Sequence, residues 1–296
     1  MCGIVGYIGH QAAAPLLVEG LRALEYRGYD SAGIALVPGD GRFRLTRASG
    51  KLVNLQAKVD FSDPTPCGIG HTRWATHGRP TEENAHPHRS ADGRVVAVHN
   101  GIFENFLELR AELQAQGCAF ASETDTEVFP VLVAHLMAGG LAFAEAFRSA
   151  VSRLQGIYAL ACLHAEEPGR ILVARSGPPL ILGLGEGETF LASDVVPLLR
   201  HTRRVIYLED GDLAELTPQG ARITDREGRA VERPVHTVPF DPVAAEKGRF
   251  KHFMQKEVFE QPQALSNTIL SRLPIGEHPI PLELPFSDTE LFYLQR

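Results

Sequence analysis

A block of helical patterns across residues 103–154 separates two groups of short apolar segments, and this order constrains the fold more than any other feature. Strands are predicted before the block at 2–8, 31–37, 42–49, 68–76 and 94–99, and after it at 157–164, 170–175, 180–184, 189–191, 205–208 and 213–216. Short turns rich in Gly or Pro join several of the later segments, among them Asp210-Gly211, and such turns indicate hairpins. The chain is therefore predicted to be an α+β protein with antiparallel sheets.

Helices are predicted at 12–24, 103–116, 124–137 and 143–154, where apolar residues recur at helical spacing. Gly117 follows the end of the second segment, and glycine is common just past a helix. Pro130 lies inside the third segment, which predicts that this helix starts late or kinks.

The composition is that of an ordinary globular protein, and it excludes two classes of partner. The chain has 296 residues, enough for one large domain or two small ones, with a formal net charge of -7. Nucleic-acid binding needs clustered Lys and Arg, which a mildly acidic chain does not favour. No segment is long and apolar enough to span a bilayer. Neither nucleic acid nor membrane is therefore an expected partner.

The cysteines and the N-terminal segment bear on the cellular compartment. Cys2, Cys67, Cys118 and Cys162 are widely spaced and form no CxxC pair, so neither a disulfide framework nor a Cys-based zinc site is predicted. The first fifteen residues have no basic region before their apolar residues, unlike a secretory signal. The cytoplasm is the expected location.

Cys2 is the first candidate for chemistry. Removal of Met1 would leave Cys2 with both a thiol and a free α-amine. An α-amine has a pKa of about 7.7–8.0 and a thiol about 8.5, so the amine can accept the thiol proton near neutral pH. This combination is typical of an N-terminal nucleophile. The alternative is that Cys2 is a small buried apolar residue at the start of a strand.

The segment His71-Thr-Arg-Trp-Ala-Thr-His-Gly78 concentrates polar and aromatic side chains after a predicted strand. The guanidinium of Arg73 suits a carboxylate, which it binds through two parallel hydrogen bonds. Trp74 would cover a small substrate as a lid, with glycines allowing the segment to hinge. The alternative is an ordinary surface strand with a buried Trp.

Imidazoles recur in Asn84-Ala-His-Pro-His88. Together with His71 and His77, these residues suggest a zinc site, because imidazole is a common zinc ligand. Their spacing matches no standard zinc motif, however, and no metal is expected. Supporting or structural roles are favoured for His86 and His88.

Two further segments carry candidate groups. Asn100 offers a side-chain amide and Gly101 an unshielded backbone N–H, and two such donors form an oxyanion hole when they point at one place. The alternative is a common Asn-Gly turn. Asp125, in Ser122-Glu-Thr-Asp-Thr-Glu127, would pair with a substrate ammonium group. The alternative there is helix capping by Ser122 or Thr124.

Taken together, these segments closely resemble the glutaminase domain of the glucosamine-6-phosphate synthase family (glutamine–fructose-6-phosphate aminotransferases, isomerising), a family of class II glutamine amidotransferases. The resemblance covers essentially the whole chain. It is carried by Cys2-Gly-Ile-Val-Gly6, Leu24-Glu-Tyr-Arg-Gly-Tyr-Asp-Ser-Ala-Gly33, Gly70-His-Thr-Arg-Trp-Ala-Thr-His-Gly78, Asn84-Ala-His-Pro-His88, His99-Asn-Gly101 and Ser122-Glu-Thr-Asp-Thr-Glu127.

The resemblance implies an N-terminal-nucleophile hydrolase fold, a four-layer sandwich with two antiparallel sheets between helical layers. It implies that L-glutamine is the substrate and that Cys2 is the nucleophile, with no cofactor. Arg73 and Asp125 would hold the α-carboxylate and α-amine of glutamine. Asn100 and Gly101 would form the oxyanion hole.

The resemblance assigns supporting roles to further residues. The loop around Trp74, Thr76 and His77 would close over bound glutamine. Arg27 and Asp30 lie in a segment that supports the site in this family, as His86 would here.

The composition changes near residue 235, and a helix is predicted at 252–270 before a Pro-rich segment at 273–296. We therefore expect an amidotransferase domain at 1–240, and at 241–296 a linker toward a sugar-phosphate isomerase domain that is absent from this chain. That domain would accept the ammonia, and the full-length protein would form a homodimer. Two rivals remain: an amidotransferase serving another acceptor, such as phosphoribosyl pyrophosphate, and a non-catalytic module of the same fold.

Overall fold

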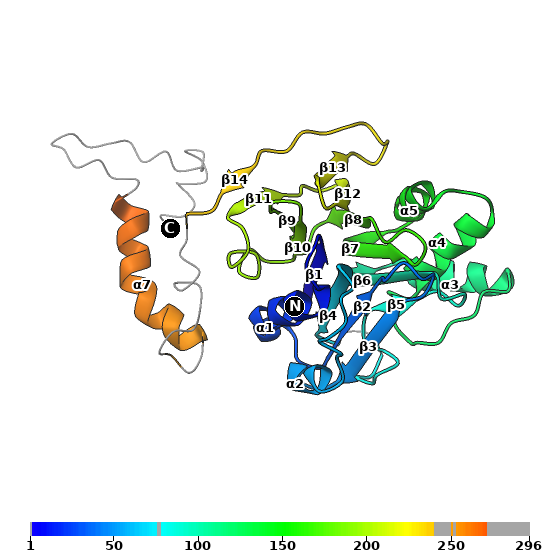
Figure 1. Ribbon diagram of the computed structural model, residues 1–296, viewed down its shortest axis with the longest axis horizontal. Helices are drawn as coiled ribbons and strands as arrows, with labels where there is room; N and C mark the ends of the chain where they lie inside the picture. Colours follow the sequence, from blue (N-terminus) through cyan, green and yellow to red (C-terminus); the bar gives the residue numbers. More distant parts are fainter. Residues whose placement is uncertain (1, 76–77, 240–249, 251–252, 271–296) are drawn as a thin grey trace, which may run out of the picture. The chain divides into compact units, whose positions relative to one another are not determined.

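The computed structural model describes residues 2–75, 78–239, 250 and 253–270 (Figure 1). The chain divides into two compact units, Met1–Phe240 and Asp241–Arg296. In the second unit, α7 (Phe253–Leu270) confirms the helix predicted at 252–270, although residue 252 lies outside the described part. The Pro-rich segment at 273–296 also lies outside it.

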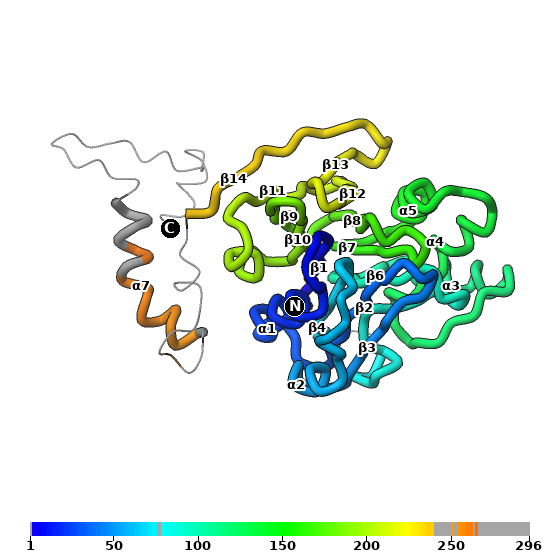
Figure 2. The backbone as a smooth tube through the Cα atoms, viewed as in Figure 1, coloured from blue at the N-terminus to red at the C-terminus, as the bar shows by residue number. Residues whose placement is uncertain are grey.

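Two antiparallel sheets form the centre of the first unit, and the larger is called sheet A. Within the described residues, sheet A has the strand order β14 (His236–Thr237), β11 (Arg204–Tyr207), β9 (Ile181–Leu184), β10 (Thr189–Ala192), β1 (Gly3–Ile8), β4 (Cys67–Arg73), β2 (Ser31–Leu36) and β3 (Arg44–Ser49). The first strand of the chain therefore lies in the interior of its sheet, between β10 and β4, as the tube in Figure 2 shows.

The second sheet, sheet B, lies against sheet A. Its order is β13 (Gly220–Thr224), β12 (Leu213–Thr217), β8 (Ile171–Ser176), β7 (Gly156–His164), β6 (Val95–Phe103) and β5 (His88–Arg89). The longest pairing joins β6 and β7, from Val95 opposite His164 to Phe103 opposite Gly156.

Helices cover the outer faces of both sheets, which gives four layers (Figure 1). On sheet A lie α1 (Ala13–Ala23) and the short α2 (Leu52–Gln56). The 3-10 helix η1 (Glu25–Arg27) follows α1 in the chain. On sheet B lie α3 (Phe106–Ala115), α4 (Val128–Ala138) and α5 (Phe143–Ser152). The α+β class and the four-layer sandwich are confirmed.

The twofold periodicity of the strands divides their apolar side chains between two cores. In β6, Val96 and Val98 face the space between the sheets, whereas Val95 and Ala97 face the helices α3–α5. Sheet B is thus buried on both faces. Each fully buried aliphatic side chain of this kind stabilises the fold by about 1.5–3 kcal/mol.

Most predicted elements are confirmed within one to four residues, and two differences are informative. The predicted helix at 103–116 begins at Phe106, because β6 continues through Asn100 and Gly101 to Phe103. This excludes an Asn-Gly turn at that point. The helix predicted at 124–137 begins at Val128, so Pro130 lies in its first turn, where no intrahelical bond to its nitrogen is needed.

The hairpin predicted across Asp210-Gly211 is wrong. The strand before it, β11, pairs with β9 and β14 in sheet A, whereas the strand after it, β12, pairs with β8 and β13 in sheet B. The turn therefore carries the chain from one sheet to the other. The hairpins β7–β8 and β9–β10 are as predicted.

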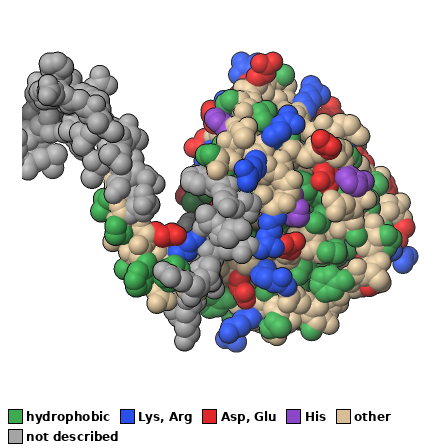
Figure 3. All heavy atoms as spheres, turned by 60° about the vertical axis from the view of Figure 1, so that its left-hand side comes forward, with side chains coloured by type: hydrophobic (Ala, Val, Ile, Leu, Met, Phe, Trp, Pro, Cys, Tyr) green, Lys and Arg blue, Asp and Glu red, His purple; other side chains and the backbone are tan. Residues whose placement is uncertain are grey.

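The described surface is mixed in charge and carries some exposed aromatic groups. On the face drawn in Figure 3, basic and acidic side chains are interspersed. Tyr29 and Trp74 are about half exposed and meet edge to face, with 5.6 Å between ring centroids. Among the described residues, no helix has both the length and the apolar character needed to cross a bilayer.

Candidate active site

The strand periodicity that builds the core also gathers the candidate residues. In β4, Cys67 and Ile69 face the space between the sheets, so His71 and Arg73 continue along the same face. In β6, Asn100 follows Val96 and Val98 on the face that looks toward sheet A. Cys2 precedes β1 in the same alternation as Ile4. The four polar groups therefore meet at one end of the apolar layer.

Cys2 lies against the backbone of Trp74, which follows β4. The amide of Trp74 donates to Cys2 Sγ at 3.2 Å, and Sγ lies 3.5 Å from the Trp74 carbonyl oxygen. Burial raises the pKa of the Cys2 thiol, while the Trp74 amide and the charge of Arg73 act in the opposite direction. The net rise means that the thiol needs a base to remove its proton at neutral pH.

Asn100 reaches from sheet B to the start of sheet A. Its side-chain nitrogen donates to the Cys2 carbonyl oxygen at 3.2 Å, and its side-chain oxygen lies 3.0 Å from His71 Nε2. The amide nitrogen of Asn100 is therefore directed at the residue that carries the nucleophilic thiol, on the side where an oxyanion donor is expected.

Gly101 has a backbone conformation that favours glycine, with φ of 135°. A Cβ atom there would lie 2.0 Å from the Ile157 carbonyl oxygen, so any side chain would clash with the neighbouring strand. Gly101 lines the same pocket as Cys2. The two predicted oxyanion donors are thus adjacent to the nucleophile.

Arg73 is buried, and its guanidinium donates to the carbonyl oxygens of Gly78 and Arg79 at 3.2 Å each. Burial lowers its pKa, but arginine stays charged because its ordinary pKa is above 12. Trp74 lies beside it at the pocket and is 45% exposed. Thr76 and His77, which were predicted to close over the substrate, lie outside the described residues.

Asp125 lies in the loop before α4 and lines the pocket. Its Oδ2 accepts a hydrogen bond from the Phe103 amide at 3.0 Å and lies 3.8 Å from His99 Nδ1. No side chain caps α4, which excludes the capping alternative for Ser122 and Thr124. The Asp125 carboxylate is held by backbone at the edge of the pocket instead.

Arg27 and Asp30 hold the segments around the site in place. Asp30 Oδ2 accepts from the Ala75 amide at 2.8 Å, directly after Trp74. Arg27 pairs with Asp194 at 2.5 Å, and this partner was not predicted. Both interactions fasten the segment after α1, one to the loop beyond β4 and the other to the segment beyond β10.

A buried group of histidines, here called the histidine cluster, lies behind the site: His71, His86, His88 and His99. His86 Nδ1 lies 3.1 Å from His71 Nδ1, and His88 Nε2 lies 3.0 Å from Thr124 Oγ1. Burial lowers the pKa of all four, that of His71 to about 3, so the rings are neutral near pH 7. The described residues include no group of side chains arranged to hold a metal ion.

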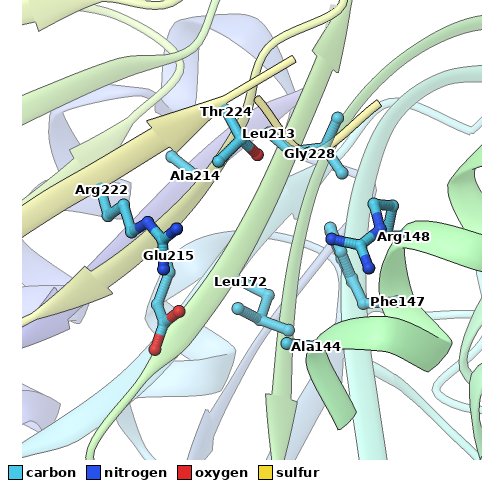
Figure 4. Close-up of a pocket in the computed structure, with 10 residues that line it drawn as sticks. All are labelled: Ala144, Phe147, Arg148, Leu172, Leu213, Ala214, Glu215, Arg222, Thr224 and Gly228. Carbon is cyan, nitrogen blue, oxygen red and sulfur yellow. The ribbon is translucent and has the colours of Figure 1, made fainter. Parts of the chain in front are cut away.

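The pocket that holds these groups is lined by Cys2, Arg73, Trp74, His86, His99, Gly101, Thr124, Asp125 and Thr126. A thiol, a cation and a carboxylate therefore face one small space. A second hollow lies elsewhere, between α5 and strands β8, β12 and β13 (Figure 4). Its rim carries Arg148 and Arg222, and it contains none of the candidate catalytic residues.

The sequence of residues 71–200 matches a protein family described as a glutamine amidotransferase domain. The chain contains a glutamine amidotransferase domain. The solved structure of glutamine phosphoribosylpyrophosphate amidotransferase from B. subtilis, complexed with ADP and GMP, matches 76% of this chain with a TM-score of 0.66 and 25% identity. That match covers 49% of the solved chain. The amidotransferase domain has the N-terminal-nucleophile hydrolase fold.

Curated relatives are more similar in sequence. A glutamine–fructose-6-phosphate aminotransferase (isomerizing) of Symbiobacterium thermophilum is 54% identical over 92% of this chain and 44% of its own length. The protein of the same name from Thermus thermophilus is 51% identical over 98% of this chain and 48% of its own length. The amidotransferase chain thus spans about half the length of these relatives. These relatives favour similarity to the glutamine–fructose-6-phosphate aminotransferases over similarity to the phosphoribosylpyrophosphate amidotransferases.

Proposed function

We propose that the domain at 1–240 hydrolyses L-glutamine to glutamate and ammonia, with Cys2 as the nucleophile. The observation that carries this proposal is the approach of Asn100, from sheet B, to Cys2, from sheet A, with the side-chain nitrogen of Asn100 3.2 Å from the Cys2 carbonyl oxygen. A hydrogen-bond donor held against the residue that carries the nucleophile suits attack on an amide.

The reaction begins when the α-amine of Cys2, freed by removal of Met1, takes the thiol proton. The thiolate attacks the side-chain carbonyl carbon of glutamine, and Asn100 and the Gly101 amide stabilise the oxyanion. The carbon–nitrogen bond breaks as the α-ammonium returns the proton, which releases ammonia and leaves a γ-glutamyl thioester. Water then attacks the thioester, and glutamate leaves as the Cys2 thiol is restored. No cofactor or metal takes part.

Arg73 and Asp125 would bind the α-carboxylate and α-amine of glutamine. Their charges are opposite to those of the two substrate groups, and both residues line the pocket with Cys2. Trp74, Thr76 and His77 would form the loop that closes over the substrate. Arg27, Asp30 and His86 would keep these segments in place, which lowers the entropic part of the barrier.

In the longer protein, the ammonia would convert fructose 6-phosphate to glucosamine 6-phosphate on a sugar-phosphate isomerase domain. The names of the curated relatives support this acceptor. Residues 241–296 would then form the linker to that domain, and the whole protein would act as a cytoplasmic homodimer.

The test is glutamate release from L-glutamine by the purified chain without sugar phosphate, after mass spectrometry has verified loss of Met1. We expect turnover in the parent chain and none in Cys2→Ala, while glutamine still binds to the variant. Cys118→Ala is the matched control, because Cys118 is a free thiol outside the pocket. Turnover by Cys2→Ala would exclude the thioester route and leave the non-catalytic rival or another nucleophile.

A further inference from the structure

His71 joins the two sheets at the candidate site. It lies on β4 of sheet A opposite Ile4 of β1, and its ring is completely buried. Its Nε2 atom lies 3.0 Å from the Asn100 side-chain oxygen and 3.0 Å from the His99 carbonyl oxygen, both on β6 of sheet B. The mechanism proposed above uses Asn100 but assigns nothing to His71.

These contacts determine which ring nitrogen carries the proton. A neutral imidazole has one N–H, and a carbonyl oxygen such as that of His99 can only accept. The proton of His71 therefore belongs on Nε2, which leaves Nδ1 as an acceptor. His86 Nδ1 lies 3.1 Å from both His71 Nδ1 and His71 Nε2, so this contact packs His86 against the His71 ring without selecting either nitrogen. Because burial lowers the pKa of His71 to about 3, this neutral form persists throughout the neutral range.

The orientation of the Asn100 amide follows from the same proton. With Nε2–H pointing at the side chain, the amide oxygen accepts from His71, and the amide nitrogen faces Cys2. In the flipped orientation two donors would meet at His71, and two acceptors would meet at the Cys2 carbonyl. A buried polar atom left without a partner destabilises the folded protein, so the flipped state is disfavoured.

We infer that His71 is a positioning residue, which holds the Asn100 amide with its N–H₂ group toward the oxyanion and is itself held by His86. This inference rests on the proposed function, because it concerns the oxyanion donor of glutamine hydrolysis. His71 touches neither the nucleophile nor the substrate in this scheme. It acts through Asn100 across the space between the sheets.

The test compares His71→Leu, which removes the donor, with His71→Gln, which places an N–H donor near the position of Nε2. We expect His71→Leu to lower kcat about 10- to 100-fold with KM changed by less than about threefold, since loss of an oxyanion donor elsewhere costs about 10²–10³ in kcat. His71→Gln should recover most of that loss. His164→Leu, which replaces another buried histidine far from the pocket, should retain kcat.

A double-mutant cycle with Asn100→Ala distinguishes positioning from a general loss of structure. The combined variant should be no slower than Asn100→Ala alone, within about threefold, because residues that act as a unit are not additive. Alkylation of Cys2 by iodoacetamide, followed by peptide mapping, should proceed at the parent rate in His71→Leu. The inference would be overturned if the losses of kcat in the two single variants multiplied in the combined variant. Slower alkylation of His71→Leu, or an unchanged kcat in that variant, would also overturn it.

A measurement on the parent protein does not depend on activity or on the folding of the leucine variant. In ¹⁵N-histidine-labelled protein, two-bond correlation spectra identify the tautomer of each ring, and the signals lost in His71→Gln belong to His71. We expect the proton on Nε2 near pH 7.5. A proton on Nδ1 would overturn the inference even if glutamine is hydrolysed. A proton on Nε2 would support it even if the isolated chain proves inactive.

Discussion

Sheet A and sheet B supply different halves of the candidate site. Sheet A brings Cys2 and Arg73, a nucleophile and a cation, whereas sheet B brings Asn100 and Gly101, the proposed oxyanion donors. In sheet A, Cys2 and Arg73 lie at the ends of their strands. In sheet B, Asn100 and Gly101 lie within β6, which continues beyond them to Phe103. The site therefore depends on how the two sheets pack, and its geometry is set by the same apolar layer that stabilises the fold.

The largest effect is expected at the sheet B donor. Gly101→Ala introduces a Cβ 2.0 Å from the Ile157 carbonyl oxygen at a φ of 135°. We expect the free energy of unfolding to fall by roughly 2–5 kcal/mol, from backbone strain and overpacking together. Turnover should fall more than about 100-fold because β6 must shift away from Cys2. Urea unfolding and glutamate release measure the two quantities.

Gly220→Ala is the matched control for Gly101→Ala. Gly220 also has a φ of 135°, but a Cβ there meets nothing within 4 Å. The free energy of unfolding of Gly220→Ala should fall only by the strain of the backbone conformation, about 1–2 kcal/mol, and turnover should be retained. Equal losses in the two variants would show that the contact with Ile157 is not what matters.

A second prediction concerns the histidine cluster behind the candidate site. The pKa of each of its four rings is lowered by burial, that of His71 to about 3, whereas an unfolded histidine titrates near 6.5. Below pH 6.5 the unfolded chain therefore binds more protons than the folded one, so stability falls as pH falls from 6.5 toward 3. Each ring contributes at most about 1.4 kcal/mol per pH unit to this slope.

Urea unfolding between pH 5 and 7.5 measures the slope, and His88→Leu should reduce it by up to about 1.4 kcal/mol per pH unit. His10→Asn is the control, since the His10 side chain is 64% exposed, and it should leave the slope unchanged. If His88→Leu leaves the slope as it is, that ring already titrates in the folded protein.

The smallest effect is expected on the sheet A side. Asp30→Asn weakens the hydrogen bond from the Ala75 amide to the Asp30 carboxylate, which fixes the segment beyond Trp74. We expect KM for glutamine to rise about fivefold, which corresponds to about 1 kcal/mol, with little change in kcat. Asp40→Asn changes a similar bond, to the Arg42 amide, on an exposed turn and should alter neither constant. A drop in kcat with constant KM would place Asp30 in the chemical step.

Much of the fold could be predicted because buried strands are apolar runs bounded by glycine and polar turns. The elements that were missed are short or polar: α2 and β13 have five residues each, η1 has three, and β5 and β14 have two each. The pairing of β11 and β12 could not be predicted, because an apolar run shows that a strand is buried without showing in which sheet. A turn such as Asp210-Gly211 is compatible with both outcomes.

The candidate site, like the fold, could be predicted only in part from the sequence. The strand alternation that places Cys67 and Ile69 in the core also predicts that His71 points inward. Its partner on the opposite sheet depends on the packing of β4 against β6, which no spacing along the chain encodes. The pairing of Arg27 with Asp194 is equally long-range, since 167 residues separate the two.

The alternation along β6 has a consequence for how this domain tolerates change. Asn100 faces the nucleophile, while its neighbour His99 stacks on Phe103 toward the helices, with 3.9 Å between ring centroids. Inserting or deleting one residue between Val95 and Asn100 would exchange these two directions. In a library of random variants, the strand should therefore accept exchanges among Val, Ile and Ala and reject insertions or deletions of a single residue.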